Sequence, residues 1–214
     1  MTSMPATQDG PFEGTGITCR RGGTRIFADI DFRLDAGDCL ILRGSNGTGK
    51  TSLLRLMAGL AAPFAGYMDW SGVSIAADPR AHARRLVRIG HSDGIKSQMT
   101  AAMHLRFHAL LWGIDEARVR IALEGMGIEH LAETEGRKLS AGQRRRLDLA
   151  RLLLEPRSLW LLDEPFAGLD GDGRALLHDA IADHRAGGGR VSLALNDGNA
   201  PSCSDVLDLD GDSS

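Results

Sequence analysis

The sequence contains a glycine-rich turn between an apolar run and a helical pattern, and this turn fixes the local path of the chain. Residues 38–43 form a short apolar run typical of a buried strand, and the apolar residues after Thr51 recur at helical spacing. Between the two stands a match to the phosphate-loop pattern. Its residues are Gly44, Ser45, Asn46, Gly47, Thr48, Gly49, Lys50, Thr51 and Ser52. A glycine-rich turn without function is the alternative, and the flanking strand and helix favour the phosphate loop.

The chemistry of such a loop depends on its backbone. Glycines allow successive N–H groups to point inward at a phosphate, and the helix that follows adds the positive end of its dipole. Lys50 would reach the β- and γ-phosphates, and the Thr51 hydroxyl would be offered to Mg²⁺. The loop therefore predicts a nucleoside triphosphate site.

A second apolar run, residues 158–162, ends in Asp163 and Glu164. Side chains at the carboxyl ends of parallel strands face the ligand crevice of the sheet. Asp163 is then placed to hold Mg²⁺, and Glu164 to orient or deprotonate an attacking water. An acidic pair after a strand can also be a helix N-cap. The phosphate loop upstream favours the catalytic interpretation.

A third motif, residues 139–143 (Leu-Ser-Ala-Gly-Gln), precedes a helical pattern that continues to residue 154. Ser140 can cap this helix, so that the helix N-terminus becomes a second anion site. An ordinary capped amphipathic helix would explain Ser140, but it leaves Gly142 and Gln143 without a reason.

In their order and spacing the three motifs resemble the Walker A, signature and Walker B motifs of ATP-binding cassette ATPases, over residues 12–209. The resemblance implies an α/β P-loop fold with a parallel core sheet, an antiparallel β edge and an inserted α-helical subdomain. We expect one ATP-binding domain over residues 10–210, a helical subdomain over about 91–138, and flexible tails at 1–9 and 211–214.

The same resemblance implies a homodimer of cassettes. Ser140, Gly142 and Gln143 of one copy would close over the γ-phosphate bound by Lys50 of the other. Asp170, at the end of residues 166–170, would cross the dimer interface. The expected cofactors are ATP and Mg²⁺, and the expected reaction is hydrolysis of ATP to ADP and phosphate.

Residues 19–22, 89–96 and 159–166 resemble the cytochrome c maturation branch of the family, whose members are ATP-binding subunits of a haem exporter. This implies haem export, or release of a haem-loaded chaperone, with an integral membrane permease and haem-handling subunits as partners. The location would be peripheral, on the cytoplasmic face of the bacterial inner membrane. The docking surface would lie on the helical subdomain near Phe107 and Trp112. An ATPase of another small-molecule exporter is the alternative, as is a soluble cassette acting on ribosomes or DNA.

Two positions depart from the family pattern. Relatives carry a Gln near the position of Ser92, whereas the nearest Gln of this chain is Gln98. Relatives also carry a His at the position where this chain has Asn196. Asparagine donates a hydrogen bond but cannot carry a proton. We therefore keep the hypothesis of slow hydrolysis, or of a nucleotide-gated clamp with little turnover. Phe27 and the Arg20–Arg21 pair are open candidates for contact with adenine, and a place in the core is an equal alternative for Phe27.

Composition sets further limits. The net charge of −3 argues against a broad nucleic-acid surface. Three cysteines without CxxC spacing predict reduced thiols of a cytoplasmic protein.

His104 and His108 stand at metal-binding spacing, yet no third ligand completes a site. Residues 144–146, three arginines, are expected to pair with acidic groups or with phosphate near the dimer interface.

Overall fold

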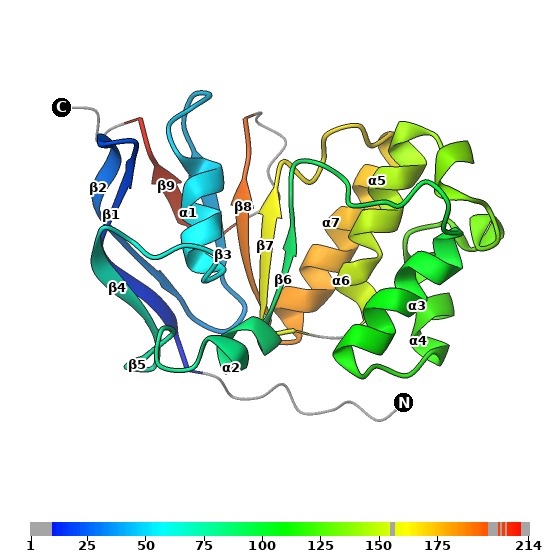
Figure 1. Ribbon diagram of the computed structural model, residues 1–214, viewed down its shortest axis with the longest axis horizontal. Coiled ribbons are helices and arrows are strands. Elements are labelled where there is room, and N and C mark those ends of the chain that lie inside the picture. Colours follow the sequence, from blue (N-terminus) through cyan, green and yellow to red (C-terminus); the bar gives the residue numbers. More distant parts are fainter. Residues whose placement is uncertain (1–9, 155–156, 197–200, 202, 204, 211–214) are drawn as a thin grey trace. The chain divides into compact units, whose positions relative to one another are not determined.

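The computed structural model describes residues 10–154, 157–196, 201, 203 and 205–210, and its elements fall into two units. The first unit lies within residues 1–88, 157–164 and 184–214, and the second within residues 89–156 and 165–183. Figure 1 shows the strands of the first unit and the helices of the second. The helical subdomain expected at 91–138 lies within the second unit, and the tails expected at 1–9 and 211–214 lie outside the described residues.

An antiparallel sheet forms the edge of the first unit, in the strand order β2-β1-β4-β5. Its strands are β1 (Phe12–Arg21), β2 (Thr24–Leu34), β4 (Ala65–Trp70) and β5 (Val73–Ser74). Gly22 and Gly23, both with positive φ, make the tight turn between β1 and β2. Phe12 pairs with Leu34 on one side and with Trp70 on the other, and all three are buried. This confirms the expected antiparallel edge.

The second sheet has the order β6-β7-β8-β3-β9. Its strands are β3 (Cys39–Arg43), β6 (Leu86–Ile89), β7 (Leu159–Asp163), β8 (Arg190–Ala194) and β9 (Asp205–Asp208). Strands β7, β8, β3 and β9 run parallel, and every residue of β7 and β8 is buried. Near-continuous burial is typical of parallel strands covered on both faces. Helix α1 (Lys50–Met57) packs on β7 and β8, and it follows β3 directly.

A buried arginine ties the first unit together. Arg190 donates hydrogen bonds to the carbonyl of Leu34 at 3.0 Å and to that of Gly10 at 2.8 Å, and its guanidinium lies over the Trp70 ring. The Trp70 indole donates to Nδ1 of His82, from helix α2 (Pro79–Arg84), whose Nε2 donates to the Met57 carbonyl. The buried side chains of Arg190, Trp70 and His82 therefore all have hydrogen-bond partners within the unit.

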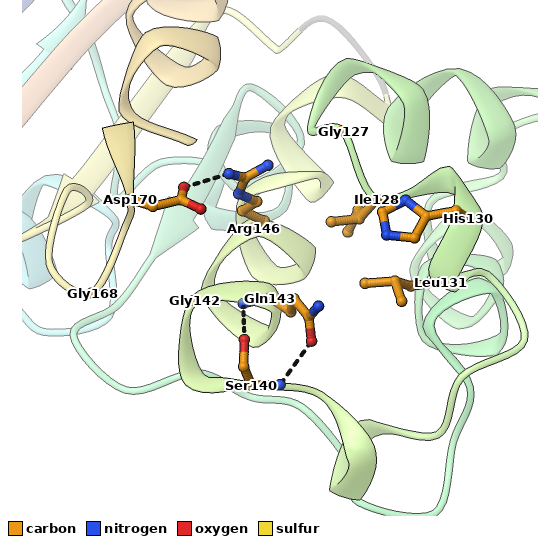
Figure 2. A pocket seen from close by; sticks show the side chains of 10 residues that line it. All are labelled: Gly127, Ile128, His130, Leu131, Ser140, Gly142, Gln143, Arg146, Gly168 and Asp170. Carbon is orange, nitrogen blue, oxygen red and sulfur yellow. Dashed lines mark hydrogen bonds and ion pairs between the residues drawn. The ribbon is translucent and has the colours of Figure 1, made fainter. Parts of the chain in front are cut away.

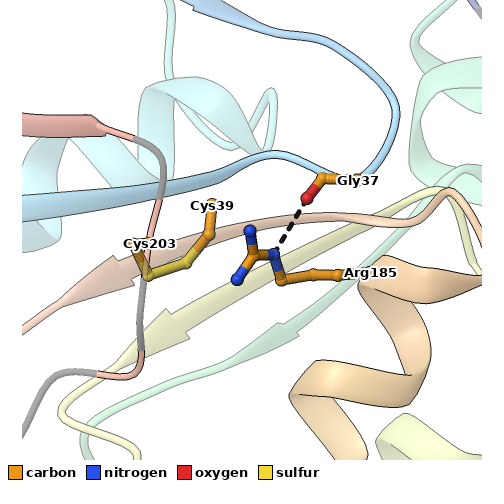
Figure 3. Close-up of a disulfide and its surroundings, with 4 residues drawn as sticks. All are labelled: Gly37, Cys39, Arg185 and Cys203. Carbon is orange, nitrogen blue, oxygen red and sulfur yellow. Dashed lines mark hydrogen bonds between the residues drawn. A yellow bond between two sulfur atoms is a disulfide. The ribbon is translucent and has the colours of Figure 1, made fainter.

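The expectation of reduced thiols is wrong for two of the three cysteines, because Cys39 and Cys203 form a disulfide (Figure 3). Cys39 is fully buried at the start of β3, as a small apolar residue would be. Parallel pairing of β9 with β3 brings the segment that contains Cys203 beside it. Arg185 donates to the Gly37 carbonyl nearby, and Cys19 remains a free thiol.

The second unit is helical. It contains α3 (Ala101–Trp112), α4 (Ala117–Gly125), the 3-10 turns η1 (Glu129–Leu131) and η2 (Gly136–Lys138), α5 (Ala141–Leu149), α6 (Arg151–Leu154) and most of α7 (Gly171–Ala186). Thr100 caps α3, and Gly113 ends it in the left-handed conformation. Arg118 of α4 donates to the carbonyls of Leu153 and Leu154 at the end of α6. Within the described ranges no helix has the length and apolar character to span a membrane.

Candidate functional site

The phosphate loop connects β3 to α1 as the sequence predicts. Gly44, Gly47 and Gly49 have φ values of 140°, 95° and 106°, which side chains rarely adopt. Lys50 begins α1 and is 8% exposed. Its ammonium donates to the Gly44 carbonyl at 2.5 Å and to the Ser45 carbonyl at 3.0 Å. The lysine therefore stabilises the curled loop, and its ammonium group lies beside the carbonyls of the loop.

Thr51 and Asp163 come together although 112 residues separate them. The Thr51 hydroxyl donates to Oδ1 of Asp163 at 3.2 Å, and Arg88 Nη2 lies 3.8 Å from Oδ2. Asp163 ends β7 and is 3% exposed. A hydroxyl and a carboxylate are oxygen donors of the kind that Mg²⁺ takes, with phosphate oxygens and waters completing its shell. In the part of the chain that the structure describes, no cluster of three His, Cys, Asp or Glu offers a competing site.

Glu164 has an unusual backbone. Its φ is 49°, in the left-handed region, and its N–H donates to the Ala194 carbonyl of β8 at 3.0 Å. Positive φ costs a non-glycine residue free energy and persists where the surroundings impose it, often at functional sites. The neighbouring strand therefore fixes the direction in which the half-buried Glu164 side chain leaves the sheet.

The two departures from the family pattern lie in different units. Asn196 is exposed two residues after β8, and Ser92 is exposed in the second unit. Gln98 lies in a turn before α3. Phe27 is wrong as a candidate for adenine contact, because it is 1% exposed in the core of the first unit. The Arg20 guanidinium lies 4.5 Å from the centre of the exposed Phe64 ring.

One residue at the phosphate loop escaped the sequence analysis. Asp210 accepts hydrogen bonds from the Ser45 N–H, at 3.0 Å and 2.9 Å to its two oxygens, and from the Ser45 hydroxyl at 2.8 Å. These bonds, helped by the charge of Lys50, hold the pKa of Asp210 below its usual value. The β3–β9 ladder continues through the hydrogen bond from Leu209 N–H to the Arg43 carbonyl, which delivers Asp210 opposite Ser45. No local sequence pattern in residues 205–210 predicts this contact.

We expect Asp210→Ala to raise the dissociation constant for ATP by about threefold or more, because the entrance of the loop then has to be ordered on binding. Asp210→Asn keeps a hydrogen-bond acceptor at Ser45 and should have a smaller effect. Titration of the isolated chain with a fluorescent ATP analogue measures both. Tighter binding by Asp210→Ala would mean that the carboxylate opposes phosphate binding and does not assist it.

The signature segment lies in the second unit, at the start of α5. Ser140 caps the helix by accepting from the Gln143 N–H at 3.2 Å, and the Gln143 side chain accepts from the Ser140 N–H at 2.8 Å. This reciprocal pair is a capping box. The predicted cap is confirmed, and the box explains Gln143 locally.

A cavity of about 350 Å³ opens beside this helix start (Figure 2). The sequence-predicted residues Ser140, Gly142, Gln143 and Asp170 all line it. Its other lining residues are Gly127, Ile128, His130, Leu131, Arg146 and Gly168. The second unit therefore gathers the signature residues and Asp170 around one hollow, while the first unit gathers Lys50, Thr51, Asp163 and Glu164 at the ends of β3 and β7.

The three arginines after the signature pair with acidic groups, as expected. Arg144 contacts Asp93, Arg145 contacts Asp148, and Arg146 contacts Asp170. The hydrogen bond from Arg146, followed by one from the Gly173 N–H, lowers the pKa of Asp170. Asp170 is therefore kept ionised by its own chain.

Comparison with known proteins agrees with this geometry. The family described as ABC transporter matches residues 27–167. The cytochrome c biogenesis ATP-binding export proteins CcmA of Paramagnetospirillum magneticum and Rhodospirillum rubrum are 44% and 45% identical to the chain. They cover 92% and 93% of it, over 94% and 85% of their own lengths.

Solved structures show the same fold. The ATP-binding subunit of an ABC transporter superposes with a TM-score of 0.79 at 25% identity, over 86% of the chain and 79% of its own. An ATP-binding protein of Pyrococcus furiosus superposes with a TM-score of 0.83 at 21% identity, over 96% of the chain and all of its own.

Proposed function

The chain belongs to the ABC transporter family, and from this membership we propose that it is the ATP-hydrolysing subunit of an export system acting in cytochrome c biogenesis. The names of the relatives, at 44% and 45% identity over most of both chains, support the cytochrome c assignment. The observation that carries the ATPase assignment is a cradle in the first unit. In it, Lys50 donates to the carbonyls of the phosphate loop, Thr51 donates to Asp163 at the end of β7, and Glu164 follows directly.

The residues of this cradle have distinct parts in hydrolysis. Lys50 would leave the loop carbonyls and donate to the β- and γ-phosphates, which neutralises charge that builds up during phosphoryl transfer. Glu164 would accept a proton from the water that attacks the γ-phosphate in line with the leaving oxygen. Thr51 and Asp163 would be the protein ligands of Mg²⁺, which neutralises charge on the phosphate oxygens when bound.

The second unit would act on the nucleotide of another copy. Ser140 at the N-terminus of α5 lines a cavity large enough for a phosphate group, and the N–H groups of the first turn add positive potential. The chain would therefore work as a homodimer, with the signature residues and Asp170 of one copy completing the site of the other.

The membrane partners would bind the exposed apolar side of α3. Four large apolar side chains of this helix are at least 47% exposed, namely Met103, Phe107, Leu110 and Leu111. An apolar surface of this kind marks an interaction site more often than free surface. An integral membrane permease with haem-handling subunits would cover it, and the chain would then lie peripherally on the cytoplasmic face of the inner membrane.

Phe107→Asp tests this function. In cells that otherwise lack the chain, we expect the variant to leave the membrane fraction and to lower the amount of c-type cytochrome by about tenfold or more, because a charge at the centre of an interface is strongly unfavourable. Val73→Asp is the matched control, since Val73 is 63% exposed on β5 of the first unit. Fractionation and haem staining give the two readouts, and thermal unfolding of the purified variants verifies that both fold.

Two outcomes would contradict the proposal. Normal membrane association and normal cytochromes with Phe107→Asp would exclude docking through α3. Failure of the wild-type chain to restore c-type cytochromes would favour the exporter of another small molecule.

The exposed Asn196 favours a second candidate, a nucleotide-gated clamp that binds ATP and turns over little. ATP binding without phosphate release by the complex would support that candidate.

A further inference from the structure

We propose that Arg146 is a positioning residue for the ATPase reaction, and that it holds Asp170 and the loop of residues 166–170 against the helix that carries the signature segment. The proposal rests on the proposed function, because the loop has a partner site to serve only in a dimeric ATPase. All the groups involved belong to the second unit.

The Arg146 side chain is only 14% exposed, and it lies in a slot between Gly127 and Gly173. A Cβ added at Gly127 would lie 3.2 Å from Arg146 Nη1, and one added at Gly173 would lie 2.8 Å from Nε. Gly127 follows α4, and Gly173 lies in the first turn of α7. Two segments far apart in the sequence thus lack side chains where the guanidinium passes, which is not needed for an arginine that points freely into solvent.

The slot directs the guanidinium at Asp170. Arg146 Nη2 donates to Oδ1 of Asp170, and the same oxygen accepts the Gly173 N–H at 2.9 Å. The Arg174 N–H donates to the Asp170 carbonyl at 3.0 Å, and Arg174 Nε donates to the Leu169 carbonyl at 3.2 Å. The end of the loop is therefore fastened to the first turn of α7 and to α5 at once, although the Asp170 side chain is 68% exposed.

The same loop also passes close to the signature turn. A Cβ added at Gly142 would lie 3.1 Å from the Gly168 carbonyl oxygen, so there is little room for a side chain between the two backbones. Arg146 stands three residues after Gln143 on α5, which puts both on one face of the helix. Figure 2 shows Gln143, Arg146 and Asp170 around the same cavity. Because the loop packs close at Gly168 and is bonded at Asp170, the loop and the signature turn would move together as one rigid surface.

This rigidity matters for catalysis. Residues that act on a nucleotide bound by another copy are positioned only by the fold of their own copy. A misplacement on the order of 1 Å can cost about a hundredfold in rate. Loosening the loop by removal of Arg146 should therefore slow the reaction without altering the phosphate loop, which belongs to the first unit.

Kinetics of Arg146→Ala provide the first test. We expect kcat to fall about tenfold to a hundredfold, while the dissociation constant of the isolated chain for a fluorescent ATP analogue changes less than about twofold. Arg146→Lys retains the charge without the planar fork and should retain more activity than alanine. Arg120→Ala is the control, since Arg120 is an exposed arginine of the same unit that forms surface ion pairs with Glu124 and Glu129. An unchanged kcat for Arg146→Ala would overturn the proposal.

A double-substitution cycle asks whether Arg146 acts through Asp170. If it does, Arg146→Ala combined with Asp170→Ala should be about as slow as the slower single variant. Losses in kcat that multiply would mean that Arg146 acts by another route, for instance as a direct contact to phosphate, and would overturn the proposal.

Amide hydrogen exchange tests the structural claim without any turnover. Arg146→Ala should speed exchange in residues 166–173 by about tenfold, with the peptides of α3 unchanged, because only local contacts are lost. Unchanged exchange in 166–173, or faster exchange throughout the unit, would contradict the proposal. This readout also separates the two hypotheses: a wild-type chain that fails to hydrolyse ATP would refute the proposed function, while exchange would still decide the role of Arg146.

Discussion

Glu164→Gln is expected to lower the rate of ATP hydrolysis by at least about a hundredfold and to leave ATP binding nearly unchanged, since a positioned general base contributes about that much or more. The amide has the shape of the carboxylate but cannot accept the proton of the attacking water. The hydrogen bond from the Glu164 N–H to Ala194 and the left-handed backbone do not depend on the side chain, so the substitution should leave the path of the chain in place. Phosphate release and titration with a fluorescent ATP analogue measure the two quantities.

The same variant should collect as an ATP-bound dimer, because closure is possible while hydrolysis is blocked. Sedimentation with and without ATP and Mg²⁺ would detect this species. Glu133→Gln is the matched control, since Glu133 is exposed in the helical unit and should behave as the wild type. A variant that keeps a third or more of the wild-type rate would place the base elsewhere. A wild-type chain as slow as the variant would favour the nucleotide-gated clamp.

The parts of the site that could be predicted from the sequence are local ones. The phosphate loop combines a strand, glycines and a helix start within about fifteen residues, so its geometry follows from neighbouring φ values and helix spacing. The cap at Ser140 is equally local, because its hydrogen-bond partner Gln143 stands three residues away. Asp163 and Glu164 could be predicted because the carboxyl ends of parallel strands meet at one edge of a sheet.

The parts that could not be predicted depend on the order of strands and on long-range packing. Asp210 reaches Ser45 across 165 residues only because β9 pairs with β3, and the same pairing brings Cys203 to Cys39. Phe27 is an aromatic residue of the kind that stacks on a base, yet its position in β2 buries its side chain in the core. The local sequence pattern does not indicate that β9 pairs with β3, and the contacts of Asp210 and Cys203 depend on that pairing.

The slot for Arg146 shows a second limit. The sequence indicates that three arginines follow the signature, and pairing with acidic groups could be predicted from their charge. Which arginine meets Asp170 depends on Gly127 and Gly173, two glycines in separate segments that make room for one guanidinium. Neither the turn glycine Gly127 nor the helix glycine Gly173 indicates in the sequence which side chain it leaves space for.

Gly49→Ala is expected to lower the free energy of unfolding by about 2–6 kcal/mol and to abolish measurable ATP binding. Two effects add at this position. A side chain at φ 106° is strained, at a cost of about 1–3 kcal/mol. The new Cβ would also lie 2.6 Å from Ile26 Cγ2 and 2.8 Å from Phe27 Cδ1, and overpacking of this kind costs about 1–3 kcal/mol more. The strain would displace the amide of Lys50, which follows directly.

Gly47→Ala separates the two effects, because Gly47 has a similar φ of 95° and nothing lies within 4 Å of a Cβ added there. Its expected cost is the backbone strain alone, about 1–3 kcal/mol. Urea unfolding of both variants gives the difference that is due to contact with β2. Ile26→Ala in the Gly49→Ala background should recover part of that difference, since it removes the closest contact. Equal destabilisation by the two glycine substitutions would contradict the steric argument, and the loop would then depend on backbone conformation alone.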